Sequence, residues 1–173
     1  MQFTNGDLVL QGRFRVLEQL ESGGTADVYR AEQVALGRLV AIKVLKPTVA
    51  ERQGMVERFE REARVLSSVD HPAIVRVLDF GQEAESPVLV MEWVDGRSLS
   101  ALLASGAMPP EKACPLLAQL AGGLAAVHEK GLVHRDLCPE NVMVSTEANV
   151  VTVRLVDFGL AKLLDIDPMA TMI

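Results

Sequence analysis

The sequence predicts an α+β protein with two lobes, a small β-rich lobe followed by the first part of a helical one. Short apolar runs of strand type fill residues 13–94, interrupted by one helical stretch. After Gly96 the composition shifts towards Leu and Ala with helical spacing. A hinge is expected over residues 92–96, where Asp95-Gly96 closes the last strand of the first lobe.

Five antiparallel strands and one helix are expected in the first lobe. The first three strands cover about residues 14–20, 28–31 and 39–45, with Gly37 in the turn between the second and third. A helix is expected over residues 49–69, where apolar residues recur at spacings of three and four: Met55, Phe59, Ala63, Leu66 and Val69. His71-Pro72 ends it, because a residue before proline is pushed out of the helical region. Strands over 75–80 and 88–94 complete the sheet.

The second lobe is expected to contain two helices and small strands. Ser98 can cap a short helix that ends near Ala104. A longer helix over residues 110–130 is apolar on most faces, with Pro115 predicting an irregular first turn. Short apolar segments over 142–144 and 150–156 predict small strands around a polar loop.

Composition narrows the function classes. The 173 residues include 17 Lys plus Arg against 23 Asp plus Glu, a net charge of −6, without a long basic run. Nucleic acid and anionic membranes are therefore disfavoured as partners. The two cysteines have neither metal-ligand spacing nor the density of a disulfide scaffold, so a reducing, cytoplasmic compartment is expected. Neither a signal peptide nor a membrane segment is expected.

Acidic and amide side chains are grouped in a way that suits phosphoryl transfer. The motif HRDLCPEN runs from His134 to Asn141, and Asp157-Phe158-Gly159 follows it. Two carboxylates and a carboxamide could converge there on a metal-bound phosphate, and this reaction needs mainly positioning and charge neutralisation from the protein. Upstream, Lys43 interrupts an apolar strand, where an amine must reach solvent or an anionic partner.

These motifs resemble those of the eukaryotic-type serine/threonine protein kinases of bacteria. Four upstream segments fit the same family in the same order: Gly23-Gly24, the VAIK sequence ending at Lys43, Arg61-Glu62-Ala63, and HPAIV from His71. The resemblance implies the two-lobed kinase fold, with an extension over 1–12, the N-lobe over 13–94 and a partial C-lobe over 95–173. Because the family domain has about 250 residues, we expect this sequence to end inside the activation segment. Thr171 is a candidate phosphate acceptor there.

The resemblance also implies roles for individual residues. Lys43 would contact the α- and β-phosphates of ATP and pair with Glu62, Asp136 would orient the substrate hydroxyl, and Asn141 and Asp157 would hold Mg²⁺. The glycine turn would cover the nucleotide, and the adenine pocket would comprise Val28, Ala41, Met91, Glu92 to Val94, and Met143. Leu66, Val77, His134 and Phe158 would stack across the lobes. Two simpler explanations stay open. The apolar residues could serve only to pack the core, and the acidic residues could cap loops through their side-chain oxygens.

Two departures from the family pattern predict weakened activity. Residues 21–28 read ESGGTADV where GxGxxGxV is expected, so Glu21 and Ala26 replace glycines and Glu21 adds a charge that repels phosphates. Cys138 stands where these kinases usually carry lysine, and a thiol cannot supply that positive charge. We expect slow turnover.

Three functions are compatible with these features. The first is a serine/threonine kinase catalytic region that transfers the γ-phosphate of Mg·ATP to a protein substrate. The second is a catalytically inactive ATP-binding pseudokinase, or a truncated regulatory module that meets a partner through uncovered C-lobe helices. The third is a small-molecule phosphotransferase such as an aminoglycoside kinase, which the combined HRD, HPxIV and DFG motifs disfavour.

Overall fold

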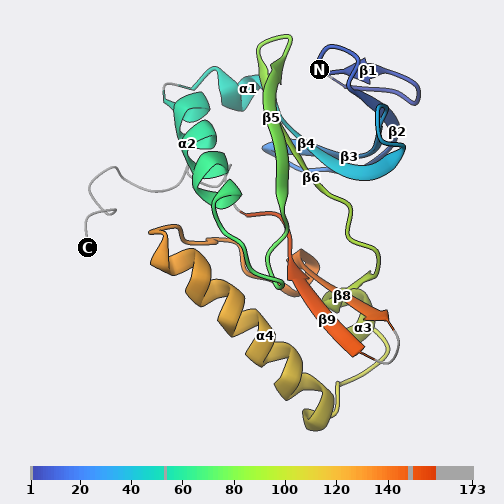
Figure 1. Ribbon diagram of the computed structural model, residues 1–173, viewed down its shortest axis with the longest axis vertical. Helices are drawn as coiled ribbons and strands as arrows, with labels where there is room; N and C mark the ends of the chain where they lie inside the picture. The colour runs from blue at the N-terminus through green and yellow to red at the C-terminus, as the bar shows by residue number, and fades with distance from the viewer. Residues whose placement is uncertain (1, 53, 148–149, 159–173) are drawn as a thin grey trace.

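The computed structural model describes residues 2–52, 54–147 and 150–158. It has an upper lobe built on a six-stranded sheet and a lower lobe of helices and a three-stranded sheet (Figure 1). The two-lobed α+β architecture predicted from the sequence is confirmed. Gly159 of the DFG motif and Thr171 lie outside the described residues.

The upper sheet is antiparallel, with strand order β1-β2-β3-β4-β6-β5. Its strands are β1 (Leu8–Val9), β2 (Phe14–Ser22), β3 (Ala26–Gln33), β4 (Arg38–Leu45), β5 (Val77–Glu83) and β6 (Ser86–Glu92). The expected count of five strands is wrong by one, because residues 1–12 contribute β1 to the sheet. The chain reverses between β1 and β2 through Leu10, Gln11 and Gly12, all at positive φ. Non-glycine residues rarely adopt that conformation, so this turn could not be predicted from Leu10 and Gln11.

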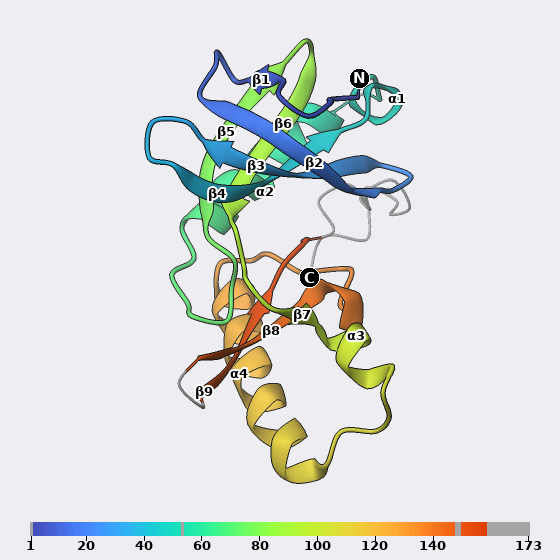
Figure 2. The same cartoon turned by 90° about the vertical axis from the view of Figure 1, so that its right-hand side faces the viewer.

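The N-terminal segment joins the two edges of this curled sheet. The backbone N–H of Leu10 donates to Glu83 on β5 at 2.6 Å, and Arg13 pairs with Asp79 on the same strand. Gly81 leaves room for the Leu10 side chain, since a Cβ there would lie 2.7 Å from Leu10 Cδ2. Residues at the start of the chain therefore pack on the far edge strand (Figure 2).

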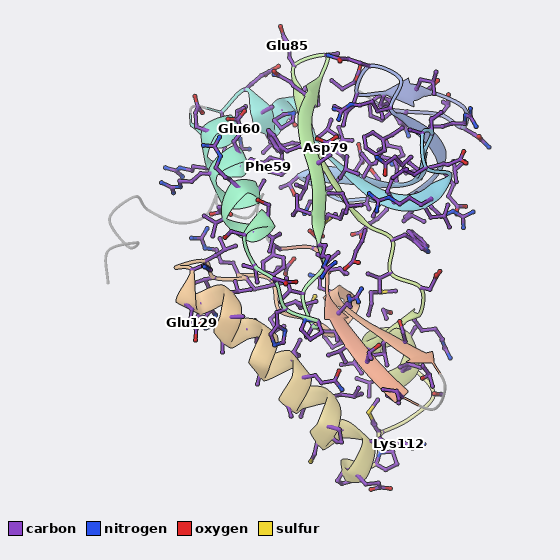
Figure 3. The ribbon with its side chains drawn as sticks, in the orientation of Figure 1. Phe59, Glu60, Asp79, Glu85, Lys112 and Glu129 are labelled. Atoms are coloured by element: carbon purple, nitrogen blue, oxygen red, sulfur yellow. The ribbon has the colours of Figure 1, made fainter. Side chains whose placement is uncertain are left out.

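The helical stretch of the upper lobe is divided into α1 (Pro47–Ala50) and α2 (Met55–Ser67). The single helix expected over 49–69 is wrong, because Gly54 adopts a left-handed conformation with φ 76° and starts a new helix. α2 buries an apolar stripe and Glu62. Phe59 points from α2 towards β5, where its ring centroid lies 5.8 Å from that of Phe80 (Figure 3).

The lower lobe contains β7 (Arg97–Ser98), α3 (Leu99–Leu103), α4 (Pro110–Glu129), a short 3₁₀ helix η1 (Pro139–Asn141), β8 (Val142–Glu147) and β9 (Val150–Leu155). The Ser98 cap is confirmed: its hydroxyl accepts from Ala101 N–H at 3.1 Å. The irregular first turn expected from Pro115 is not seen, and α4 is continuous from Pro110. Pro115 lacks an N–H for the carbonyl of Glu111, but that carbonyl belongs to the exposed first turn of the helix, where water can bind it.

The loop between α2 and β5 connects the lobes. It descends from α2 to the level of α4 and β9 before turning back into β5 (Figure 1). Ala73 O accepts from Leu155 N at 2.8 Å, and Val75 N donates to Leu155 O at 3.1 Å. Gly123 lets α4 approach closely, since a Cβ there would lie 3.1 Å from the Ile74 side chain. One buried apolar cluster consequently spans both lobes.

Within the described part of the chain, the helices are too short or too polar to cross a membrane.

Candidate active site

An apolar cavity of about 230 Å³ lies between the lobes. The predicted adenine-contacting residues that line it are Val28, Ala41, Met91, Glu92, Trp93, Val94 and Met143. Asn141 and Asp157, the predicted metal ligands, line it as well. Strands β3, β4, β6 and β8, together with η1 and the segments that follow β6 and β9, bring these residues together from positions far apart in the sequence.

Other lining residues were missed by the sequence interpretation: Leu20, Val75, Glu140 and Val156. Val75 ends the HPAIV motif and Val156 precedes Asp157, so adjacency to recognised motifs was the available signal. Gly23, Gly24, Lys43, Glu62 and Asp136 are not among the lining residues. Larger hollows of about 430 Å³ between α2 and β5, and about 670 Å³ beside α3 and α4, contain none of the predicted site residues.

Lys43 lies on β4, and its buried side chain reaches the second lobe. Its Nζ donates to Asp157 Oδ1, and Phe158 O lies 3.5 Å away. The exposed fractions of the two ion-paired side chains are 6% for Lys43 and 29% for Asp157. A lysine within an apolar strand needs such an anionic partner, because an isolated buried ammonium is strongly disfavoured.

The expected pair between Lys43 and Glu62 is wrong in this structure. Glu62 Oε1 instead accepts from Arg135 Nη1 at 3.1 Å, and both side chains are largely buried. Arg135 lies in the loop that carries HRDLCPEN, residues 134–141, here called the catalytic loop. Arg135 has φ 62°, a left-handed conformation, and its side chain reaches Glu62 on α2. Burial raises the pKa of Glu62, and the Arg135 guanidinium opposes that rise. The four charged side chains therefore form two ion pairs, Lys43 with Asp157 and Arg135 with Glu62, instead of the expected pair of Lys43 with Glu62.

His134 holds the catalytic loop in a defined geometry. Its Nδ1 accepts from Asp136 N–H at 3.2 Å, so Nε2 carries the proton and donates to Val156 O at 3.3 Å. Burial lowers the pKa of His134, which keeps the ring neutral. The ring centroid lies 4.6 Å from that of Phe158, so the expected contact between these two rings is present.

Asn141 and Asp157 have the oxygen chemistry of a Mg²⁺ site. Asn141 Nδ2 donates to Asp136 O at 2.9 Å, which leaves its carbonyl oxygen as the group able to bind a cation. The described residues contain no cluster of three or more His, Cys, Asp or Glu suited to a metal. Mg²⁺ bound to a nucleotide needs only one or two protein oxygens, because phosphates and waters supply the rest. The two residues fit such an ion.

Comparisons with known proteins agree with this geometry. The protein kinase domain family matches residues 14–173. The chain belongs to the protein kinase family. It is 56% identical over 165 residues to the serine/threonine-protein kinase pkn2 of Myxococcus xanthus, covering 95% of this chain and 20% of that protein. It is 41% identical over 155 residues to PknL of Mycobacterium tuberculosis, covering 89% and 38% of the two chains. The expected likeness to bacterial serine/threonine kinases is confirmed.

Solved kinase structures show the same fold. The M. tuberculosis PknI kinase domain superposes with a TM-score of 0.79 at 28% identity, covering 92% of this chain and 64% of that one. Rad53 in complex with AMP-PNP gives a TM-score of 0.77 at 30% identity, covering 87% and 39%. The chain thus spans a fifth to two fifths of these curated relatives and just under two thirds of the PknI domain.

The glycine turn of this kinase chain connects β2 to β3. Gly23 N–H donates to Ala26 O at 3.0 Å, so that amide is used within the hairpin. Neither Gly23 nor Gly24 has a positive φ, and Gly24 has open space where a Cβ would be. The exposed Glu21 lines the cavity. A carboxylate therefore forms part of the cavity lining.

Cys138 lies at the start of η1, two residues after Asp136. Burial raises the pKa of its thiol, so the side chain is neutral near pH 7. Cys114 on α4 is the other cysteine, and both are free thiols. Position 138 thus presents no charge towards the catalytic loop, whereas a lysine would present a positive one.

Proposed function

We propose that this chain is the catalytic region of a serine/threonine protein kinase, which transfers the γ-phosphoryl group of Mg·ATP to a protein hydroxyl. One observation carries the proposal. Lys43 from the upper lobe pairs with Asp157 from the lower lobe, and Asp157 lines an apolar cavity between the lobes. A cation and an anion arranged in this way are suited to a phosphate chain and its metal ion, beside a pocket suited to a planar base.

The cavity side chains would hold the adenine ring. Val28 and Ala41 come from the upper sheet and Met143 from β8, so apolar groups of both lobes contribute. Glu92 to Val94 form the connection between the lobes, and their backbone polar groups would bind the edge of the base. Burial of an aromatic base against such side chains supplies much of the binding free energy.

The polar residues would act on the phosphates and the substrate. Lys43 would exchange Asp157 for phosphate oxygens, which frees the Asp157 carboxylate to hold Mg²⁺ together with Asn141. When bound, the metal ion would neutralise charge that develops on the phosphates. Asp136 would orient the substrate hydroxyl and accept its proton. In the observed pairing Lys43 and Asp157 neutralise each other, and Glu62 is held by Arg135.

A nucleotide-binding module without catalysis is the second candidate. Two observations favour it: the neutral thiol of Cys138 and the carboxylate of Glu21 at the cavity. Loss of one electrostatic contact to a transition state reduces the rate by about 10²- to 10³-fold. We therefore propose slow catalysis. A protein substrate, a cytoplasmic location, and a partner that covers exposed apolar residues such as Leu117 and Val133 belong to the same proposal.

A thermal-shift titration with ATP and Mg²⁺ tests nucleotide binding. A ligand at a hundred times its Kd stabilises the folded state by about 2.7 kcal/mol. We expect this shift in the wild type and its loss in Lys43→Met and Asp157→Asn. Lys112→Met, which removes an exposed lysine of α4, is the matched control and should keep the shift (Figure 3).

Transfer of the γ-phosphate to a generic protein then separates the two candidates. Transfer by the wild type that Asp136→Asn abolishes supports the kinase. Binding without measurable transfer supports the second candidate. A wild type that gives no shift with ATP and Mg²⁺ contradicts both.

A further inference from the structure

Arg154 connects three segments behind the candidate adenine pocket. It lies on β9, where its backbone partner on β8 is Met143, a residue of the cavity. Its Nη1 donates to Glu92 Oε1 at 2.9 Å, and its Nε donates to Pro72 O at 3.1 Å. Glu92 ends β6 and begins the connection between the lobes. One guanidinium therefore bonds to the hinge and to the loop between α2 and β5.

Glu92 is held by the same loop through a second set of bonds. Its Oε1 also accepts from Arg76 N–H at 3.0 Å, and its own N–H donates to Arg76 O at 3.0 Å. The loop is in turn fixed to β9 by two backbone hydrogen bonds of Leu155. These contacts lie at the junction of the two lobes.

Glu92 is shared by two hollows. It lines the candidate adenine pocket, and it also lines a hollow of about 250 Å³ with Asp70, His71, Pro72, Ile74, Arg76 and Arg154. Its backbone is therefore part of the pocket, while its carboxylate is bound by Arg154 and by the Arg76 N–H. Arg154 lies three residues before Asp157 on the same extended segment. The pair thus joins the adenine-facing hinge to the strand that leads to the candidate metal ligand.

We propose that Arg154, Glu92 and the Pro72 carbonyl form an interlobe clasp, which positions the hinge relative to Asp157 and restrains rotation of one lobe against the other. The contribution to nucleotide binding rests on the proposed function, whereas the restraint itself does not. Arg154 and Glu92 are positioning residues: their polar side-chain atoms bond to protein groups, and they act on the pocket through the backbone of residues 92–94.

The solvent exposure of Arg154 and Glu92 limits how much their ion pair contributes to the restraint. The exposed side-chain fractions are 36% for Arg154 and 22% for Glu92, so solvent weakens the interaction. Partly exposed ion pairs change local equilibria by up to about five-fold. Arg154→Met removes the bonds to both Glu92 and Pro72, whereas Glu92→Gln keeps an acceptor for Arg76 N–H. The arginine variant should therefore have the larger effect.

Two readouts at the hinge require no nucleotide. Hydrogen exchange of the Glu92 amide reports directly on its bond to Arg76 O. Trp93 is the one tryptophan of the sequence, and its Nε1 donates to Asp95 at 2.7 Å, so its fluorescence reports on the same segment. We expect Arg154→Met to accelerate exchange at residues 92–94 by about five-fold and to shift Trp93 emission.

Three further variants decide whether the clasp exists. Arg154→Lys restores a charge facing Glu92 without the second donor, so it should recover part of the protection. The double variant Arg154→Met/Glu92→Gln should be no faster than Arg154→Met alone. Arg15→Met, which breaks an ion pair to Glu32 within the upper sheet, is the matched control and should leave residues 92–94 unchanged.

Unchanged exchange and fluorescence in Arg154→Met would overturn the clasp, as would an equal response in Arg15→Met or uniform acceleration throughout the chain. A titration of Trp93 emission with ATP and Mg²⁺ then tests the consequence, and the clasp variants should show a two- to five-fold change in Kd. If the wild type does not bind ATP, the proposed function fails, while the exchange data still decide the clasp.

Discussion

Double-mutant cycles can establish which cation neutralises Glu62. In the structure Glu62 pairs with Arg135, and their side chains are 8% and 19% exposed. Arg135→Met leaves a buried carboxylate without a partner, which destabilises a protein by about 3 kcal/mol, at the lower end of values for broken buried pairs. Glu62→Gln keeps a hydrogen-bond acceptor for the guanidinium, so a loss of about 1–2 kcal/mol is expected.

The double variant Glu62→Gln/Arg135→Met should be no less stable than Arg135→Met, which gives a coupling of about 1 kcal/mol or more. The parallel cycle of Glu62→Gln with Lys43→Met should be additive within about 0.3–0.5 kcal/mol, because Lys43 bonds to Asp157. Urea unfolding followed by circular dichroism measures all the variants. At this chain length 1 kcal/mol corresponds to about 2–4 °C in Tm.

The pH dependence of Arg135→Met provides an independent check. Burial raises the pKa of Glu62, and removal of Arg135 removes a charge that opposes this rise. A carboxyl group with a raised pKa in the folded state binds protons more readily folded than unfolded, so its cost diminishes as the pH falls. Acidification should therefore reduce the destabilisation. A larger coupling of Glu62 with Lys43 than with Arg135, in protein free of nucleotide, would refute the observed pairing.

Three further predictions follow from single positions. Burial lowers the pKa of His134, so the stability of the wild type should fall as the pH drops below about 6.5. His134→Gln should flatten this dependence of Tm on pH, whereas the control His128→Gln, at the exposed end of α4, should not. Gly96 has φ 144°, and a Cβ there would lie 2.4 Å from Val144 O, so Gly96→Ala should lose about 2–4 kcal/mol in urea unfolding, whereas Gly24→Ala should lose little. Cys138→Lys should raise the rate of γ-phosphate transfer, and an unchanged rate would exclude an electrostatic deficit at this position.

The sequence alone was sufficient for the family and for most of the residues that line the cavity between the lobes. The HRDLCPEN and DFG motifs are short segments that can be recognised locally, and most residues predicted for the adenine pocket line one cavity. Apolar alternation placed the main strands, since half-buried strands carry that pattern locally. Ser98 could be recognised as a helix cap because a cap is a hydrogen bond between residues close in the sequence, here Ser98 and Ala101.

Ion-pair partners were decided only by tertiary structure. Lys43, Glu62, Arg135 and Asp157 allow more than one neutral pairing, and the choice depends on the position of α2 relative to the catalytic loop. The link between Arg154 and Glu92 joins residues 62 positions apart and has no sequence motif. The strand formed by Leu8–Val9 pairs with β2, and the adjacent Leu10 bonds to the distant edge strand β5, a contact that no local pattern indicates. Local patterns fix elements, whereas long-range charge pairing and sheet edges depend on how those elements pack.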